Sequence, residues 1–215
     1  LVRLSEFEFP VMLDDGRRAY FESVAARERA EVKQAVNRML STNPPDAGAV
    51  RFLSQSPEWN ATLRTTCVAT MLDAGHAENA LPQRAKATVN CRVLPHDDVV
   101  AVERTLKTLA GDKITVKALF PPTASPPSPL NADVLGPVEK LTGEMWPGVP
   151  VVPSMSTGAT DARFLRNIGM PVYGVSGLFS DPSDFRAHGL NERILVKQLY
   201  EGREFLYRLV KELAN

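Results

Sequence analysis

Cysteine and histidine are scarce in this sequence. Only two cysteines, Cys67 and Cys91, occur in 215 residues, and two are too few for a disulfide framework. They could be neighbours on adjacent strands, which leaves a single bond open, but we do not expect one. None of the three histidines, His76, His96 and His188, has the close-spaced second ligand of an H-E-x-x-H zinc motif.

Charge imbalance and long apolar runs are also missing. Lys plus Arg and Asp plus Glu both number 25, so neither a nucleic-acid partner nor a strongly charged partner is expected. No apolar stretch approaches the roughly 20 residues of a membrane helix. The hydrophobic fraction of 44% is enough to form a core. The chain begins with Leu1 and not with Met, so we expect the natural N-terminus to be missing, which leaves the compartment open.

The first 120 residues combine helical and alternating patterns. Asp97 and Asp98 supply a cap for the second of the helices. Alternation of apolar and polar residues indicates strands that expose one face. These patterns predict an α+β domain with an antiparallel sheet, built from helices over residues 20–40 and 99–109 and from strands over residues 62–72, 85–94 and 114–119.

A proline-rich stretch divides the chain. Five prolines lie between residues 120 and 129, and this density excludes a helix or a central strand and indicates a linker. We therefore place the domain boundary near residue 120, with domains over residues 1–120 and 121–215. Strands alternating with helices in the second domain predict an α/β layer with a mostly parallel sheet, from helices over 133–146, 161–168 and 192–213 and strands over 149–153 and 171–176.

Among the histidines, His188 has the most suggestive setting. It lies in a polar, glycine-containing loop just before the terminal helix. A histidine there, near the end of an α/β sheet, could reach a crevice at the strand ends. The alternative is that His188 only caps or decorates the helix. His76 and His96 both lie in turns, where a solvated surface role is the default.

Two further clusters could carry chemistry. The small residues around Gly158 and Thr160 follow a buried strand and open a helix, so their N–H groups could bind a carboxylate; the alternative is ordinary capping by Thr160 or Asp161. Asn79 precedes Arg92 by thirteen residues. Asn79 could donate to an oxyanion and Arg92 could clamp a carboxylate, unless both are simply solvated.

These clusters, in this order, resemble a known family. The chain is similar to the di-zinc peptidases that include glutamate carboxypeptidase, aminoacylase, carboxypeptidase S and succinyl-diaminopimelate desuccinylase. The likeness covers nearly the whole chain. It is strongest over residues 78–92, 156–166 and 187–193.

The resemblance implies a fold in two parts. In this family an α/β catalytic domain is interrupted by an inserted lid that also forms the dimer. Residues 1–120 resemble the lid, a ferredoxin-like antiparallel sheet with helices, incomplete at its N-terminal side. Residues 121–215 resemble the C-terminal part of the α/β zinc-peptidase catalytic domain. A homodimer through the lid is implied.

The resemblance also assigns roles to single residues. His188 matches the final histidine of the catalytic domain, which binds one of two zinc ions. Asn79 matches a lid residue that contacts substrate and stabilises the oxyanion, and Arg92 matches one that holds substrate. Gly158 and Thr160 match a turn beside the substrate carboxylate. The implied enzyme is a metallopeptidase that hydrolyses the amide bond of small peptides or N-acyl amino acids with a free carboxylate.

The sequence departs from the family in what it does not contain. The other zinc ligands, the glutamate that acts as general base and the lid histidine all lie upstream of the equivalent of Leu1. We therefore expect a fragment that is inactive alone, and an inactive dimerisation module is the alternative. A serine hydrolase with Ser176, Asp181 or Asp184, and His188 is a weaker rival, because the sequence around Ser176 is not G-x-S-x-G.

Overall fold

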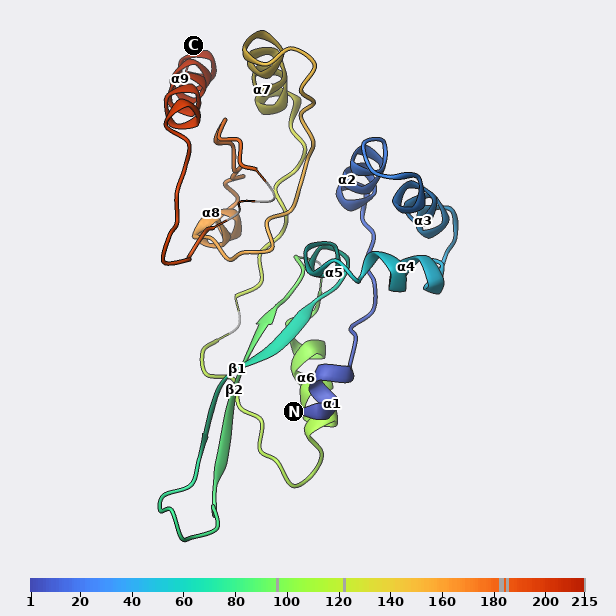
Figure 1. Cartoon of the computed structure of the whole chain (residues 1–215), viewed down its shortest axis with the longest axis vertical. Coiled ribbons are helices and arrows are strands. Elements are labelled where there is room, and N and C mark those ends of the chain that lie inside the picture. Colours follow the sequence, from blue (N-terminus) through green and yellow to red (C-terminus); the bar gives the residue numbers. More distant parts are fainter. Residues whose placement is uncertain (96, 122, 182–183, 185, 215) are drawn as a thin grey trace. The chain divides into compact units, whose positions relative to one another are not determined.

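The fold is taken from a computed structural model that describes residues 1–95, 97–121, 123–181, 184 and 186–214. These residues form nine helices and one two-stranded antiparallel sheet, drawn along the chain in Figure 1. In chain order the elements are α1 (Val2–Glu6), α2 (Asp15–Ala25), α3 (Ala30–Ser41), α4 (Ala47–Leu53), α5 (Pro57–Leu63), β1 (Thr66–Ala74), β2 (Ala85–Arg92), α6 (Val99–Ala110), α7 (Ala132–Met145), α8 (Ala162–Asn167) and α9 (Val196–Leu213).

Internal contacts group the described residues into two compact units. The first unit consists of Leu1–Pro127 together with Pro153–Met170, and the second consists of Ser128–Val152 together with Pro171–Asn215. Each unit is described by itself below. The assignment of residues 1–120 to a lid and of residues 121–215 to a catalytic domain stays a prediction.

Helices α2 to α5 enclose the core of the first unit. The expected single helix over residues 20–40 is wrong, because the chain turns between α2 and α3. The turn lets the two helices pack side by side and face a common interior, which one straight helix could not do. Helices α4 and α5 were not predicted, although Asp46 and Ser56 cap their first turns. The buried residues of this core are Phe21, Ala25, Val32, Ala35, Val36, Met39, Ala49, Val50, Leu53 and Leu63.

The two expected strands around residue 80 form a hairpin. Strands β1 and β2 pair antiparallel, with Ala74 opposite Ala85 nearest the connecting loop and Thr66 opposite Arg92 at the far end. A bulge interrupts the register between Ala69 and Met71. The first strand begins later than predicted, because residues 62 and 63 complete α5. The helix predicted after this hairpin is confirmed as α6, with Asp98 accepting a hydrogen bond from the N–H of Val100 at 2.9 Å.

Three other predicted strands are absent from the described residues. Residues 114–119, 149–153 and 171–176 are extended or irregular and enter no ladder. A strand needs a partner that accepts and donates its backbone hydrogen bonds, and only β1 and β2 provide such partners to each other in the part of the chain that is described. The parallel sheet expected in the second part is therefore not seen.

Helices α7 and α9 form the core of the second unit, where they pack on each other through Val138, Leu141, Phe205 and Leu209. The predicted helices over residues 133–146 and 161–168 are confirmed as α7 and α8, and the terminal helix begins four residues later than expected. Burial of each of these apolar side chains contributes roughly 1.5–3 kcal/mol. The segment after residue 175 lies close against α9: a Cβ on Gly202 would come within 2.5 Å of Leu178 Cδ2.

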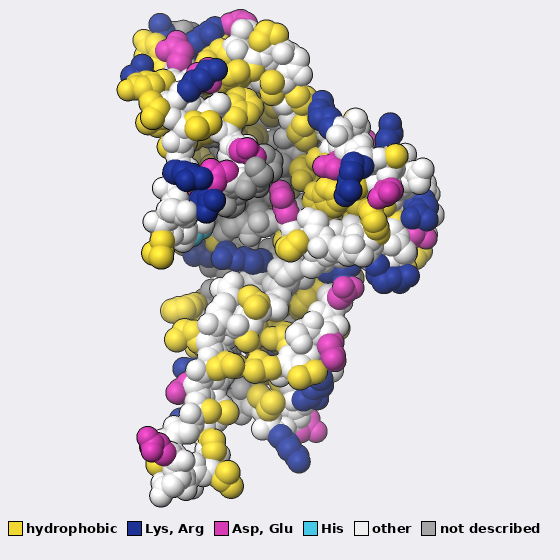
Figure 2. Space-filling view, in the orientation of Figure 1, with side chains coloured by type: hydrophobic (Ala, Val, Ile, Leu, Met, Phe, Trp, Pro, Cys, Tyr) yellow, Lys and Arg dark blue, Asp and Glu magenta, His cyan; other side chains and the backbone are white. Residues whose placement is uncertain are grey.

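The surface mixes charges of both signs. On the face drawn in Figure 2, lysine and arginine side chains are interspersed with aspartate and glutamate, in keeping with the zero formal net charge. Among the helices that the structure describes, none is both long and apolar enough to cross a membrane.

Candidate functional site

The hairpin separates the two residues on it that were predicted to contact substrate. Asn79 is exposed in the loop that joins β1 to β2, whereas Arg92 is exposed at the last position of β2. Seven residue steps lie between Ala85 and Arg92, and at about 3.3 Å per step the strand spans roughly 23 Å. Within one chain, these two side chains therefore do not meet at a common small ligand.

A disulfide joins the two strands. Cys67 and Cys91 are directly opposite in the register, their Cα atoms lie 4.1 Å apart, and their sulfur atoms are bonded. The expectation that they would not be bonded is wrong. Alternation along each strand turns both side chains to the same face of the hairpin, and directly opposed cysteines at this Cα separation are within reach of each other.

The turn with Gly158 and Thr160 belongs to the first unit. Both residues are exposed, and Gly158 donates its N–H to Ser156 Oγ at 3.2 Å. Asp161 is the first residue of the turn into α8, but its side chain makes no capping hydrogen bond. Among the described residues, Asp161 therefore does not cap α8 with its side chain. Carboxylate binding by the turn, and with it the roles of Gly158 and Thr160, stays a prediction.

His188 lies in the second unit in an unusual backbone conformation. Its φ angle is +65°, and it is the one residue other than glycine with positive φ among the described residues. The left-handed region costs a residue with a side chain roughly 1 kcal/mol. The side chain of His188 is exposed and forms no hydrogen bond with a described residue.

An ionic cluster closes the loop on both sides of His188. Asp184 Oδ1 accepts from Arg186 Nε and from Arg193 Nη2, both at 2.7 Å, and Asp184 Oδ2 accepts from Arg193 Nε at 2.9 Å. Arg193 thus binds the carboxylate with two parallel bonds, the strongest form of this pair. Hydrogen bonds from Arg193 and Arg186 lower the pKa of Asp184 from 3.8 to about 2.

This cluster argues against the version of the serine triad that uses Asp184. A triad aspartate orients its histidine by accepting from the ring, but both oxygens of Asp184 accept from arginines. Ser176 Oγ accepts from the Leu178 N–H at 3.2 Å. No hydrogen bond joins Ser176, Asp184 and His188 in the described part of the chain.

The described residues fit zinc at one ligand position and no more. An exposed imidazole such as that of His188, which has no hydrogen-bond partner among the described residues, is an ordinary zinc ligand. A catalytic zinc, however, takes about three protein ligands. Across the described residues, no group of three or more His, Cys, Asp or Glu side chains is placed to hold a metal ion. The remaining ligands of any zinc site would therefore have to come from outside these residues. His96, assigned above to a turn, lies outside the described residues.

Two buried arginines were missed by the sequence interpretation. Arg17 forms an ion pair with Asp14 at 2.9 Å, and its Nη2 lies 3.9 Å from Met155 Sδ. Burial lowers the pKa of Arg17, against the opposing effect of Asp14 and Asp97. Arg64 pairs with Glu8 and donates to Ser54 Oγ at 3.4 Å. Nothing in residue type or spacing distinguishes these two from the solvated arginines nearby.

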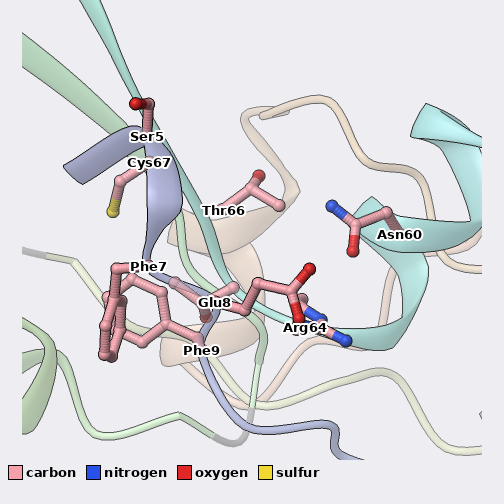
Figure 3. Close-up of a pocket in the computed structure, with 9 residues that line it drawn as sticks. Ser5, Phe7, Glu8, Phe9, Asn60, Arg64, Thr66 and Cys67 are labelled. Atoms are coloured by element: carbon pink, nitrogen blue, oxygen red, sulfur yellow. The ribbon is translucent and has the colours of Figure 1, made fainter. Parts of the chain in front are cut away.

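A small pocket of about 150 Å³ lies beside Arg64. Figure 3 shows the carboxylate of Glu8 next to the Arg64 guanidinium and the amide of Asn60 facing the same space. Asn60 Oδ1 and Arg64 Nε are buried there and find no hydrogen-bond partner in the described part of the chain. Such a polar pocket has room for water, which ordinarily satisfies groups of this kind. None of the predicted site residues lines it.

Comparison with known proteins identifies the family of this chain. The model of the peptidase family M20/M25/M40 matches residues 15–212. The human N-fatty-acyl-amino acid synthase/hydrolase PM20D1 is 34% identical over 169 residues, which cover 75% of this chain and 33% of that protein. Aminoacylase-1A from Rattus norvegicus is 27% identical over 205 residues, which cover 91% of this chain and 47% of that protein.

A solved structure shares the fold. The M20 family metallo-carboxypeptidase Sso-CP2 from Sulfolobus solfataricus superposes with a TM-score of 0.57 at 17% identity, covering 94% of this chain and 46% of that one. This likeness extends to the fold alone. The chain thus spans between a third and a half of the length of the proteins it matches.

Proposed function

We propose, because this chain belongs to the peptidase family M20/M25/M40, that it is part of a zinc-dependent hydrolase that cleaves the amide bond of small peptides or N-acyl amino acids with a free carboxylate. The family match over residues 15–212 carries the proposal. The names of its relatives support the substrate class, since they include an N-fatty-acyl-amino acid hydrolase and an aminoacylase.

Each predicted residue would have a distinct task. Arg92 would hold the substrate carboxylate through two parallel hydrogen bonds. Asn79 would donate to the oxyanion that develops on the scissile carbonyl. The turn with Gly158 and Thr160 would lie beside the same carboxylate. His188 would occupy one ligand position of a zinc centre, and two zinc ions in the complete enzyme would supply a water nucleophile activated at neutral pH.

The length of the hairpin supports a homodimer. Since roughly 23 Å of strand lies between the loop with Asn79 and the end with Arg92, one small substrate does not reach both residues of one chain. In a two-fold dimer, Arg92 of one protomer and Asn79 of its partner could act on the same substrate. We therefore propose that each active site is shared between two chains.

Subunit mixing tests this arrangement in the full-length protein. Arg92→Ala and Asn79→Ala homodimers should each lose activity towards an N-acyl amino acid, the first mainly through a higher KM and the second through a kcat lower by about 10²–10³-fold. After subunit exchange, half of the dimers carry one intact shared site, so roughly a quarter of the wild-type activity should return. Mixtures that stay as inactive as their components would contradict the shared site.

Chelation and substrate chemistry test the reaction itself. Removal of metal by a chelator should abolish hydrolysis, and added zinc should restore it. An otherwise identical substrate with its carboxylate converted to an amide should react poorly with the wild type, and Arg92→Ala should reduce this preference. Hydrolysis that survives complete metal removal would refute the assignment to this class of enzyme.

An inactive dimerisation module is the second candidate. The hairpin exposes Val68, Met71 and Leu72, each to more than 60%, and an isolated two-stranded hairpin is marginally stable in water. Apolar side chains on such an element favour contact with a partner. This candidate predicts a dimer that neither binds zinc nor hydrolyses amides.

A further inference from the structure

The loop that carries His188 is held at both ends by a single carboxylate. Asp184 lies four residues before His188 and Arg193 five residues after it. Three hydrogen bonds to Asp184, at 2.7, 2.7 and 2.9 Å, join the two ends of this loop and also engage Arg186. Isolated exposed ion pairs contribute little, but a two-point arginine–carboxylate pair within a network is the exception.

Two backbone hydrogen bonds also hold the loop between Asp184 and Arg193, whose side chains form a clamp across it. The N–H of Gly189 donates to the carbonyl of Arg186 at 3.0 Å, and the N–H of Glu192 donates to the carbonyl of Gly189 at 3.2 Å. A Cβ on Gly189 would lie 3.2 Å from the Arg186 oxygen. The Arg186 carbonyl oxygen therefore lies close to the place where a Cβ would stand, and glycine at position 189 avoids that contact.

His188 lies within this closed loop and has a left-handed backbone conformation. A side-chain-bearing residue in the left-handed region persists only where its surroundings determine the conformation. The φ of +65° at His188 lies within the turn from Arg186 and between the two residues joined by the bond from Arg193 to Asp184. No hydrogen bond joins the imidazole to the described residues of the cluster, so the cluster would act on it through the backbone.

We propose that Asp184 is a positioning residue that, through Arg186 and Arg193, fixes the backbone at His188 and so presents its imidazole as a metal ligand. This inference rests on the proposed function, in which His188 binds zinc. It adds Asp184 and its two arginine contacts, to which the family match assigns no role. Groups that orient a metal ligand commonly change metal affinity by 10–100-fold when they are removed.

Zinc affinity in the full-length protein is the main readout. Asp184→Asn keeps the size of the side chain and removes its charge, and it should weaken zinc binding 10–100-fold in a competition assay with a chromophoric chelator. Asp184→Glu should restore part of the affinity. Arg193→Lys, which keeps the charge but loses the two-point geometry, should give an intermediate loss, and it keeps the proposal testable if Asp184→Asn fails to fold.

A matched control separates positioning from general stability. Glu212→Gln removes another exposed ion pair of the same unit, with Lys140 at 2.7 Å, and should leave zinc affinity unchanged. In the metal-free protein, Asp184→Asn should raise the rate of trypsin cleavage after Arg186 and Arg193, whereas Glu212→Gln should not. The cobalt-substituted form of Asp184→Asn should show an altered visible spectrum.

The outcomes distinguish the positioning role of Asp184 from the assignment of His188 as a metal ligand. His188→Ala should lose zinc altogether from the position it serves. If His188→Ala loses zinc while Asp184→Asn and Arg193→Lys bind it with wild-type affinity, the positioning role is refuted and the proposed function stands. If His188→Ala keeps all of its zinc, both the positioning role and the metal-ligand assignment are refuted.

Discussion

Reduction of the disulfide should loosen the hairpin that carries Asn79. The bond between Cys67 and Cys91 closes a loop with a sequence separation of 24 residues. The loss of loop-closure entropy in the unfolded chain corresponds to a stabilisation of roughly 3.5 kcal/mol for a loop of this length. Because a two-stranded hairpin is marginal by itself, this contribution is large relative to the local stability of β1 and β2.

The predicted change can be measured by amide hydrogen exchange and calorimetry on the full-length protein. With reductant, backbone amides of the paired strands should exchange faster by up to about 300-fold, the factor that corresponds to 3.5 kcal/mol. The thermal midpoint of the same unit should fall by several degrees. A double variant with Cys67→Ser and Cys91→Ser should behave like the reduced protein and should not respond to reductant. Two titratable thiols in the native, unreduced protein, or exchange that ignores reductant, would refute this reasoning.

Two further changes probe the second unit. Gly202→Ala should destabilise the protein by roughly 1–3 kcal/mol in urea unfolding, since its Cβ would lie 2.5 Å from a Leu178 carbon. Gly143→Ala lies in a helix where no described residue comes within 4 Å of the added carbon, so it should instead stabilise the protein by about 0.5–1 kcal/mol. Equal effects of the two alanines would contradict the close packing described for α9. The pKa of Asp184 is lowered from 3.8 to about 2, so its clamp should persist above pH 4 and be lost as the pH falls towards 2. Carbon NMR of the carboxyl group should show a midpoint near 2 that Arg193→Lys raises; a midpoint near 3.8 in the wild type would argue against the clamp.

Local signals in the sequence predicted the helices better than the strands. Asp98 and the apolar spacing after it identify α6, because a cap and a 3.6-residue period are both local. Asp46 and Ser56 give the same kind of signal for α4 and α5, which a search for caps would have found. Residues 114–119 have a strand pattern, but a strand also needs a partner, and the partner is not encoded in the segment itself.

The candidate site was likewise predictable from the sequence only in part. The order of three segments, over residues 78–92, 156–166 and 187–193, suggested the family, and the family match confirms that relationship. The sequence pattern placed Asn79 in the loop and Arg92 on the following strand, and it is the extended length of β2 that holds the two residues apart. The link from Asp184 to Arg193 was invisible, since either residue alone is typical of a solvated loop.

The measurement that tests the central claim most directly is the intact mass of the natural protein together with its zinc content. A mass well above the 23.6 kDa of this chain, with about two zinc ions per chain, is the result that we predict for a zinc-dependent amide hydrolase of which these residues are a part. A mass near 23.6 kDa without zinc would contradict the account and would leave the dimerisation module as the function of the chain.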